Sequence, residues 1–307
     1  FVLLILDIPL NGKLYLGSPE AFKEEKYYAL SKDPNFCREE NKEFVPTTRN
    51  LRSAECFSDS KENKTLFFIG DSHNLAFLKG AEFLAKQTNR NLTFERSILG
   101  PIQESQNKDL YKFLLFNQPT NLIKFVDLAL NKSKEGDIVF LTIRMPFRFL
   151  ESWYTTIDKQ FRGEKYFIRW LYALEAFANN LEKKNVKLIV LYPTPEFRYS
   201  GYQQCKNQNP QWFNRLSKKD CLFPLDYFDY PNGKYASIIK KINEVSLKHN
   251  NLYFFNALEA ICPDDLCKYS VGKYPLYKDA NHISDYAAEK LIAPKLLRFL
   301  KDEILFD

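Results

Sequence analysis

Short apolar runs alternate with amphipathic segments between residues 65 and 300. Four of these runs are almost entirely apolar: 65–69 (TLFFI), 138–143 (IVFLTI), 186–192 (VKLIVLY) and 252–255 (LYFF). Such runs, without polar alternation, are typical of strands that are buried on both faces. Apolar residues at helical spacing predict helices over 74–86, 166–184, 235–249 and 285–300.

The alternation of strands and helices predicts the fold class. We expect an α/β protein with three layers (α/β/α) and a central, mostly parallel sheet. Ligands of such sheets bind at the carboxyl ends of the strands. Residues 16–60 and about 197–234 fit the alternation poorly and hold four of the six cysteines. They are either binding loops or plain covering of the surface, and in both cases we expect their cysteines to cross-link them.

The chain begins with an apolar decamer, 1–10 (FVLLILDIPL), interrupted only by Asp7. It is either the end of a transmembrane helix whose upstream part is missing or a buried strand at a processed terminus. No other apolar run approaches the roughly 20 residues that a membrane-spanning helix needs. We therefore divide the chain into an N-terminal extension, 1–59, and a folded domain, 60–307.

The composition is that of a folded domain, with 307 residues, 45% hydrophobic and 27% charged. Lysine and arginine outnumber acidic residues by 44 to 38, a net charge of +6. The basic residues are scattered among acidic ones and form no stripe, so we expect no nucleic-acid partner. The sequence also has no phosphate-binding loop, no dinucleotide fingerprint and no zinc-protease motif, and we expect neither cofactor nor metal.

Six cysteines indicate an oxidising compartment. Neighbours along the chain would form three local disulfides, although six cysteines allow fifteen pairings. A zinc site built from the last four is one alternative, and reduced core cysteines are another. The six are Cys37, Cys56, Cys205, Cys221, Cys262 and Cys267.

The candidate chemistry lies in two short segments at opposite ends of the domain. Ser72 comes directly after the first buried run, where a strand ends and a helix begins. His282 follows Asp279 by three residues, so one turn brings the carboxylate to the imidazole. If Ser72 and His282 meet, they form a nucleophile, a base and an orienting carboxylate. Otherwise Ser72 is an N-cap and the second segment is a surface turn.

These two segments resemble the motifs of the SGNH (GDSL-like) hydrolase superfamily. Residues 70–73 (GDSH) match the block that carries the nucleophilic serine, and 279–282 (DANH) match the Asp-x-x-His block. The C-terminal region is most similar to the SGNH domain that follows the acyltransferase-3 membrane module in bacterial glycan O-acyltransferases. There a Cys-Pro…Cys pair precedes a Tyr-x-Asp-x-x-His motif, here at Cys262, Cys267 and Tyr277. The resemblance covers about 60–305, is strong at both ends, and identifies 60–307 as the catalytic domain.

The resemblance assigns roles to individual residues. Ser72 matches the nucleophile, Asp279 the orienting carboxylate and His282 the base. Gly100 stands where the second block has its oxyanion glycine. The third block, Gly-x-Asn-Asp in the superfamily, is absent, and Arg144 stands near its position as an oxyanion or substrate contact, or as a salt-bridged residue at a strand end.

The implied function is O-acyl transfer, most simply of acetyl, to a cell-surface polysaccharide through an acyl-serine. The resemblance implies an acyl donor delivered by an upstream membrane module, with this domain tethered at the periplasmic or extracytoplasmic face of the inner membrane. A carbohydrate O-acetyl esterase is the second interpretation. An inactive glycan-binding domain is the third, motivated by the missing third block.

Overall fold

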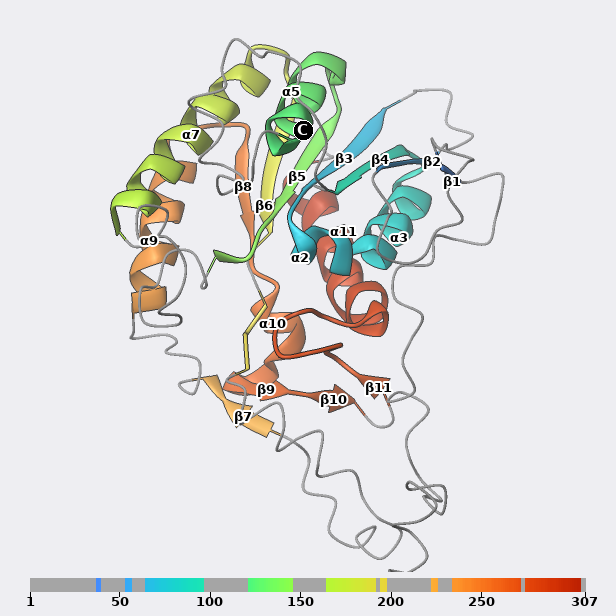
Figure 1. Ribbon diagram of the computed structural model, residues 1–307, viewed down its shortest axis with the longest axis vertical. Coiled ribbons are helices and arrows are strands. Elements are labelled where there is room, and N and C mark those ends of the chain that lie inside the picture. Colours follow the sequence, from blue (N-terminus) through green and yellow to red (C-terminus); the bar gives the residue numbers. More distant parts are fainter. Residues whose placement is uncertain are drawn as a thin grey trace, which may run out of the picture.

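A computed structural model describes residues 37–39, 53–56, 64–96, 121–145, 164–191, 194–197, 222–225, 234–271 and 274–304. Within them the chain forms a central sheet with helices on both faces (Figure 1). The decamer 1–10, Gly100, Cys205 and Cys221 lie outside the described residues.

The central sheet has seven described strands in the order β1-β2-β4-β3-β5-β6-β8. The five from β4 to β8 run parallel, while β2 pairs antiparallel with β4 and β1 pairs antiparallel with β2. The strand bounds are β1 Cys37–Glu39, β2 Ser53–Cys56, β3 Thr65–Gly70, β4 Asn91–Arg96, β5 Ile138–Thr142, β6 Lys187–Leu191 and β8 Leu252–Phe255. The predicted parallel α/β sheet is confirmed.

Helices cover both faces because alternate residues of the central strands point to opposite sides. On β3, Leu66 and Phe68 pack with one group of helices: α2 (Ser72–Ala76), α3 (Leu78–Thr88), α10 (Leu258–Ile261), the π-helix η7 (Ala287–Ile292) and α11 (Ala293–Glu303). Phe67 and Ile69 pack with the other group: α5 (Asn121–Lys132), α7 (Glu164–Glu182) and α9 (Lys234–Ser246). The structure therefore has three layers, as the sequence predicts.

The two cores explain why these strands contain no polar alternation. All five residues of β5 are buried, and Phe140 stacks on Phe68 with ring centroids 4.2 Å apart. On the opposite face, Trp170 and Phe177 of α7 are fully buried. A strand between two helical layers has no solvent-facing side, so apolar residues occupy successive positions.

Two small antiparallel sheets extend the structure beyond the carboxyl ends of the main strands. Strand β7 (Leu222–Pro224) pairs with β9 (Leu266–Lys268), and β10 (Ser270–Val271) pairs with β11 (Tyr274–Pro275). Just before β9, a single 3-10 turn, η6 (Pro263–Asp265), follows α10. The helical pattern of the sequence did not predict these short strands.

One of the expected local disulfides joins α10 to β9. Cys262 and Cys267 are bonded to each other across a sequence separation of five. The alternatives of a four-cysteine zinc site and of six reduced cysteines are therefore wrong, since two of the sulfurs are consumed in this bond. Cys37 and Cys56 lie directly opposite each other in the β1–β2 register. Their disulfide stays a prediction.

Strands β1 and β2 belong to the stretch that we assigned to the N-terminal extension, yet they pair within the main sheet. Among the described helices, none has the length and apolar character required to cross a bilayer.

Candidate active site

The site lies at the carboxyl ends of three neighbouring parallel strands. Ser72 follows β3, Arg144 follows β5, and Glu196 lies in the short segment 194–197 after β6. Figure 1 shows β3, β5 and β6 side by side in the sheet. This is the edge of a parallel sheet at which ligands bind. His249, by contrast, comes just before the amino end of β8, at the opposite edge of the sheet.

Asp71 shapes the turn that presents Ser72. It is the N-cap of α2, and its Oδ1 accepts a hydrogen bond from the backbone N–H of His73. Its Oδ2 accepts the backbone N–H of Arg144 at 2.9 Å, and its own N–H donates to the carbonyl of Thr142. The carboxylate thus accepts a hydrogen bond from a free N–H at the start of α2 and connects the ends of β3 and β5.

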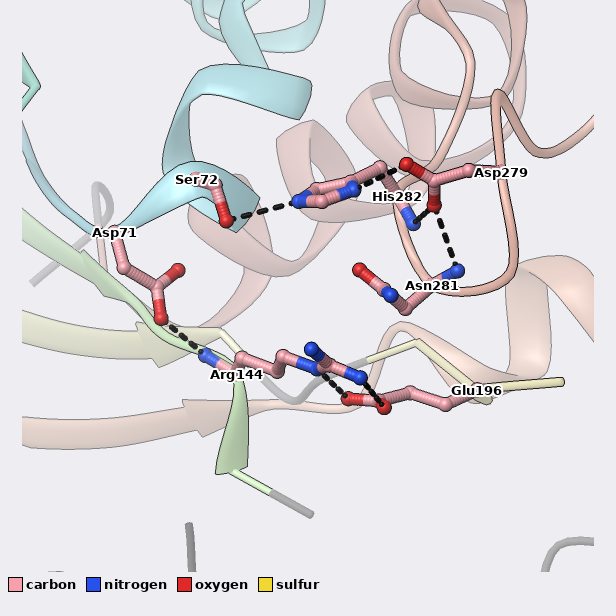
Figure 2. Close-up of polar contacts among 7 residues, drawn as sticks. All are labelled: Asp71, Ser72, Arg144, Glu196, Asp279, Asn281 and His282. Atoms are coloured by element: carbon pink, nitrogen blue, oxygen red, sulfur yellow. Dashed lines mark hydrogen bonds and ion pairs between the residues drawn. The ribbon is translucent and has the colours of Figure 1, made fainter. Parts of the chain in front are cut away.

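Ser72 meets His282 although 210 positions separate them. The Oγ of Ser72 lies 2.8 Å from Nε2 of His282, and Nδ1 of His282 lies 2.6 Å from Oδ2 of Asp279 (Figure 2). The structure therefore brings together the three residues that the sequence singled out. With the proton of Nδ1 directed at Asp279, Nε2 is the acceptor for the hydroxyl of Ser72.

The turn that carries His282 is fixed by its own backbone. Oδ1 of Asp279 accepts the N–H groups of Asn281 and His282, and the N–H of Lys278 donates to the carbonyl of His282. Partial burial by itself would raise the pKa of Asp279, but the hydrogen bond and charge of His282 and these two N–H groups lower it to about 2. Asp279 is therefore ionised at neutral pH and orients the imidazole.

A second histidine lies against the first. The rings of His73 and His282 are 4.9 Å apart, and His73 is buried. Burial, together with His282 and Arg144, holds the pKa of His73 well below its usual value of 6.5. His73 is thus neutral at neutral pH.

Arg144 pairs with Glu196 at the floor of the site. The Nε of Arg144 lies 2.8 Å from Oε1 of Glu196, and its Nη2 lies 2.6 Å from Oε2. Of the two sequence interpretations of Arg144, the salt bridge is present, and the guanidinium also borders the space in front of Ser72 and His282 (Figure 2). Gly100, the expected glycine donor, lies outside the described residues.

Sequence reasoning missed two polar residues of this site. Asn281 directs its side chain into the space bounded by Ser72, His282 and Arg144 (Figure 2). Asn281 also lies close to His73, and its proximity acts against the lowering of the His73 pKa. The Oδ1 of Asn281 and the Nε2 of His73 nevertheless form no hydrogen bond with each other. The position of Asn281 inside the DANH motif was the available signal. For Glu196 the only signal was a carboxylate shortly after a buried strand.

The described residues contain no group of three or more histidine, cysteine, aspartate or glutamate side chains suited to a metal ion. The site itself offers a hydroxyl, an imidazole base and an ionised carboxylate in line. A hydroxyl activated in this way attacks acyl carbonyls.

Comparisons with solved structures give matches at low sequence identity, with TM-scores below 0.5. The periplasmic domain of a lipopolysaccharide acetyltransferase from Salmonella ser. Paratyphi A is 16% identical over 76% of this chain and 84% of its own, with a TM-score of 0.48. The M. Smegmatis aryl esterase is 12% identical over 78% and 100%, with a TM-score of 0.41. A mutant of an acetyl-xylooligosaccharide esterase from Geobacillus Stearmophilus is 15% identical over 79% and 94%, with a TM-score of 0.38.

No curated protein sequence matches the chain significantly. The model of one protein family does match it, over residues 37–296, which is most of its length. That family is described as the SGNH domain that is fused to AT3 domains. The match spans both the Ser72 turn and the Asp279–His282 turn, and the chain belongs to this family.

Proposed function

We propose that this domain transfers an O-acyl group, most simply acetyl, to a hydroxyl of a cell-surface polysaccharide through an acyl-enzyme at Ser72. The observation that carries the proposal is the continuous line of contacts from Ser72 to His282 to Asp279. Membership of a family whose domains are fused to AT3 domains supports transfer as the outcome.

The first half-reaction forms the acyl-serine. Oγ of Ser72 attacks the carbonyl carbon of the donor ester while Nε2 of His282 takes the hydroxyl proton. The ionised Asp279 stabilises the imidazolium that results. Collapse of the tetrahedral intermediate expels the donor alcohol, which receives the proton from Nε2.

Negative charge on the carbonyl oxygen needs a donor during this step. We assign Arg144 to it, because the superfamily asparagine is missing and the guanidinium borders the space in front of Ser72. Gly100 is proposed as a further donor on the resemblance alone.

The second half-reaction transfers the acyl group. His282 removes a proton from an acceptor hydroxyl, whose oxygen attacks the acyl-serine and restores Ser72. A sugar acceptor gives O-acetylated polysaccharide, and water gives hydrolysis. The intact Ser72–His282 contact favours both enzymatic outcomes over an inactive glycan-binding domain, in which nothing would maintain it.

We further propose that the domain works in the periplasm, beside a membrane module that delivers the acyl donor. The family description, in which the domain is fused to AT3 domains, supports this arrangement. The disulfide between Cys262 and Cys267 supports an oxidising compartment.

The proposal is tested with 4-nitrophenyl acetate as acyl donor. We expect an acetyl group on Ser72 by mass spectrometry, and acetylated sugar once de-O-acetylated surface polysaccharide from the source organism is added. Ser72→Ala should lower turnover by more than about 10⁴-fold. Ser133→Ala is the control, because Ser133 is a buried serine away from the site and its Oγ has no hydrogen-bond partner among the described residues.

Two other outcomes of these experiments would identify the two alternative functions. Release of acetate at the same rate with and without polysaccharide would assign the chain as an esterase. Absence of any Ser72 adduct, with the acetyl ester and with a serine-directed phosphonate, would leave the glycan-binding domain.

A further inference from the structure

Glu196 is a buried carboxylate that the mechanism above does not use. Its side chain is only 1% exposed, against 20% for its partner Arg144. The carboxylate binds the guanidinium in a bidentate, side-on manner through Nε and Nη2. A bidentate pair fixes the plane of the guanidinium as well as its position.

This ion pair links the two turns that carry the catalytic residues. On one side, the backbone N–H of Arg144 donates to Asp71, the residue before Ser72. On the other side, the N–H of Phe197, next to Glu196, donates to the carbonyl of Ala280 at 2.7 Å, within the Asp279–His282 turn. The guanidinium is therefore held relative to both the nucleophile and the base.

Stability alone gives little reason for a buried ion pair at this place. Removing two charges from water is costly, and well-packed apolar residues often replace such a pair without loss of stability. Burial raises the pKa of Glu196, and the hydrogen bonds and charge of Arg144 act against that rise. Arg144 thus favours the ionised form of the carboxylate, and the carboxylate fixes the orientation of the guanidinium.

The side of the guanidinium opposite Glu196 faces the reaction centre. Figure 2 shows the third guanidinium nitrogen, Nη1, on the side that is turned from Glu196 toward Ser72 and His282. The charge of Arg144 also reaches the neighbouring imidazole, because it contributes to the lowered pKa of His73.

We propose that Glu196 is a positioning residue of this active site: its carboxylate holds the guanidinium of Arg144 in the orientation that stabilises the oxyanion formed at Ser72. This inference rests on the proposed function. It assigns to Glu196 an effect on the transition state that is exerted through Arg144 and not through the substrate.

The test compares Glu196→Gln and Glu196→Asp in the acylation of Ser72 by 4-nitrophenyl acetate. We expect Glu196→Gln to lower kcat by about 10- to 100-fold, up to the effect of losing one oxyanion donor, with KM nearly unchanged. Glu196→Asp should recover part of the rate because it retains the charge. The matched control is Glu82→Gln, which removes another buried, ion-paired glutamate outside the site and should leave kcat unchanged.

A double-mutant cycle separates positioning from a general effect on folding. In an Arg144→Lys background, which lacks the bidentate fork, Glu196→Gln should cause little further loss of kcat. Equal losses in both backgrounds would overturn the proposal, and so would a wild-type kcat in Glu196→Gln. If Glu196→Gln does not fold by circular dichroism, Glu196→Asp in the same two backgrounds decides the question. Failure of Ser72 to become acylated in the wild-type chain would instead refute the proposed function.

Discussion

The ring of His73 lies against that of the proposed base His282, and its pKa is held well below 6.5 by burial and by the nearby His282 and Arg144. Two adjacent imidazoles that were both protonated would repel each other and Arg144. A neutral His73 leaves His282 as the ring that changes charge during the reaction. We therefore interpret His73 as a support of the base.

This shift in pKa predicts how stability depends on pH. The unfolded chain takes up a proton on His73 as the pH falls through 6.5, and the folded chain does not. The folded state should therefore lose stability below that pH, by up to about 1.4 kcal/mol per pH unit from this group. Urea unfolding of wild type and His73→Gln between about pH 7 and pH 5 measures it. The free energy of unfolding should fall less steeply with decreasing pH in the variant than in the wild type. Parallel pH dependences of the two proteins would contradict the prediction.

At the level of the elements, the β3–α2 turn requires very close contact between two strand ends. A Cβ on Gly70 would lie 1.9 Å from the carbonyl oxygen of Thr142, at the end of β5. The same carbonyl accepts the N–H of Asp71, so it has little freedom to move. Glycine at position 70 therefore lets β3 and β5 approach closely enough for Asp71 to bridge them.

Gly70→Ala should separate these strand ends and displace Ser72. We expect a loss of about 2 kcal/mol or more in the free energy of unfolding, and a larger fractional loss of Ser72 acylation than of folded protein. Gly136→Ala is the comparison: its φ of +81° is unfavourable for alanine by about 1 kcal/mol, but its nearest neighbour, the flexible side chain of Lys64, can move aside. Denaturant unfolding and phosphonate labelling measure the two effects. Equal stability of the two variants would contradict the close-approach argument.

At the level of the whole molecule, the disulfide joins the helical layer to the small sheets beyond the strand ends. Both cysteines are buried, and the bond closes a short loop between α10 and β9. In the chain-entropy description, a loop of this length stabilises the fold by about 2 kcal/mol. Most of that effect arises in the unfolded chain and not at the active site.

Replacing Cys262 and Cys267 together by serine should therefore lower the free energy of unfolding by about 2 kcal/mol. A reductant should lower the melting temperature of the wild type and have a smaller effect on the double variant. Thermal unfolding with and without dithiothreitol measures this. Ser72 acylation at low temperature should survive in the variant, and its loss would show that the disulfide shapes the site itself.

Much of this architecture follows from local sequence pattern. The apolar runs at 65–69 and 138–143 became β3 and β5, because a strand covered on both faces leaves no position for a polar side chain. The short strands β7 and β9 were not predicted, since three residues carry no measurable periodicity. The last predicted helix, 285–300, contains the π-helix η7 near its start and continues as α11, a change of hydrogen-bond pattern that apolar spacing does not report.

The sequence by itself determined the layered fold and the local chemistry of the two motifs, because a turn between neighbouring residues is set by those residues. The Asp279–His282 contact spans three positions and was predicted on that basis. The tertiary structure alone decided the Ser72–His282 contact, which spans 210 positions, and the pairing of Arg144 with Glu196. Parallel strands bring their carboxyl ends to one edge of the sheet, which makes Ser72, Arg144 and Glu196 neighbours. The turn with His282 reaches the same edge because η7 and α11 pack on the sheet beside β3 and the N–H of Phe197 binds the carbonyl of Ala280.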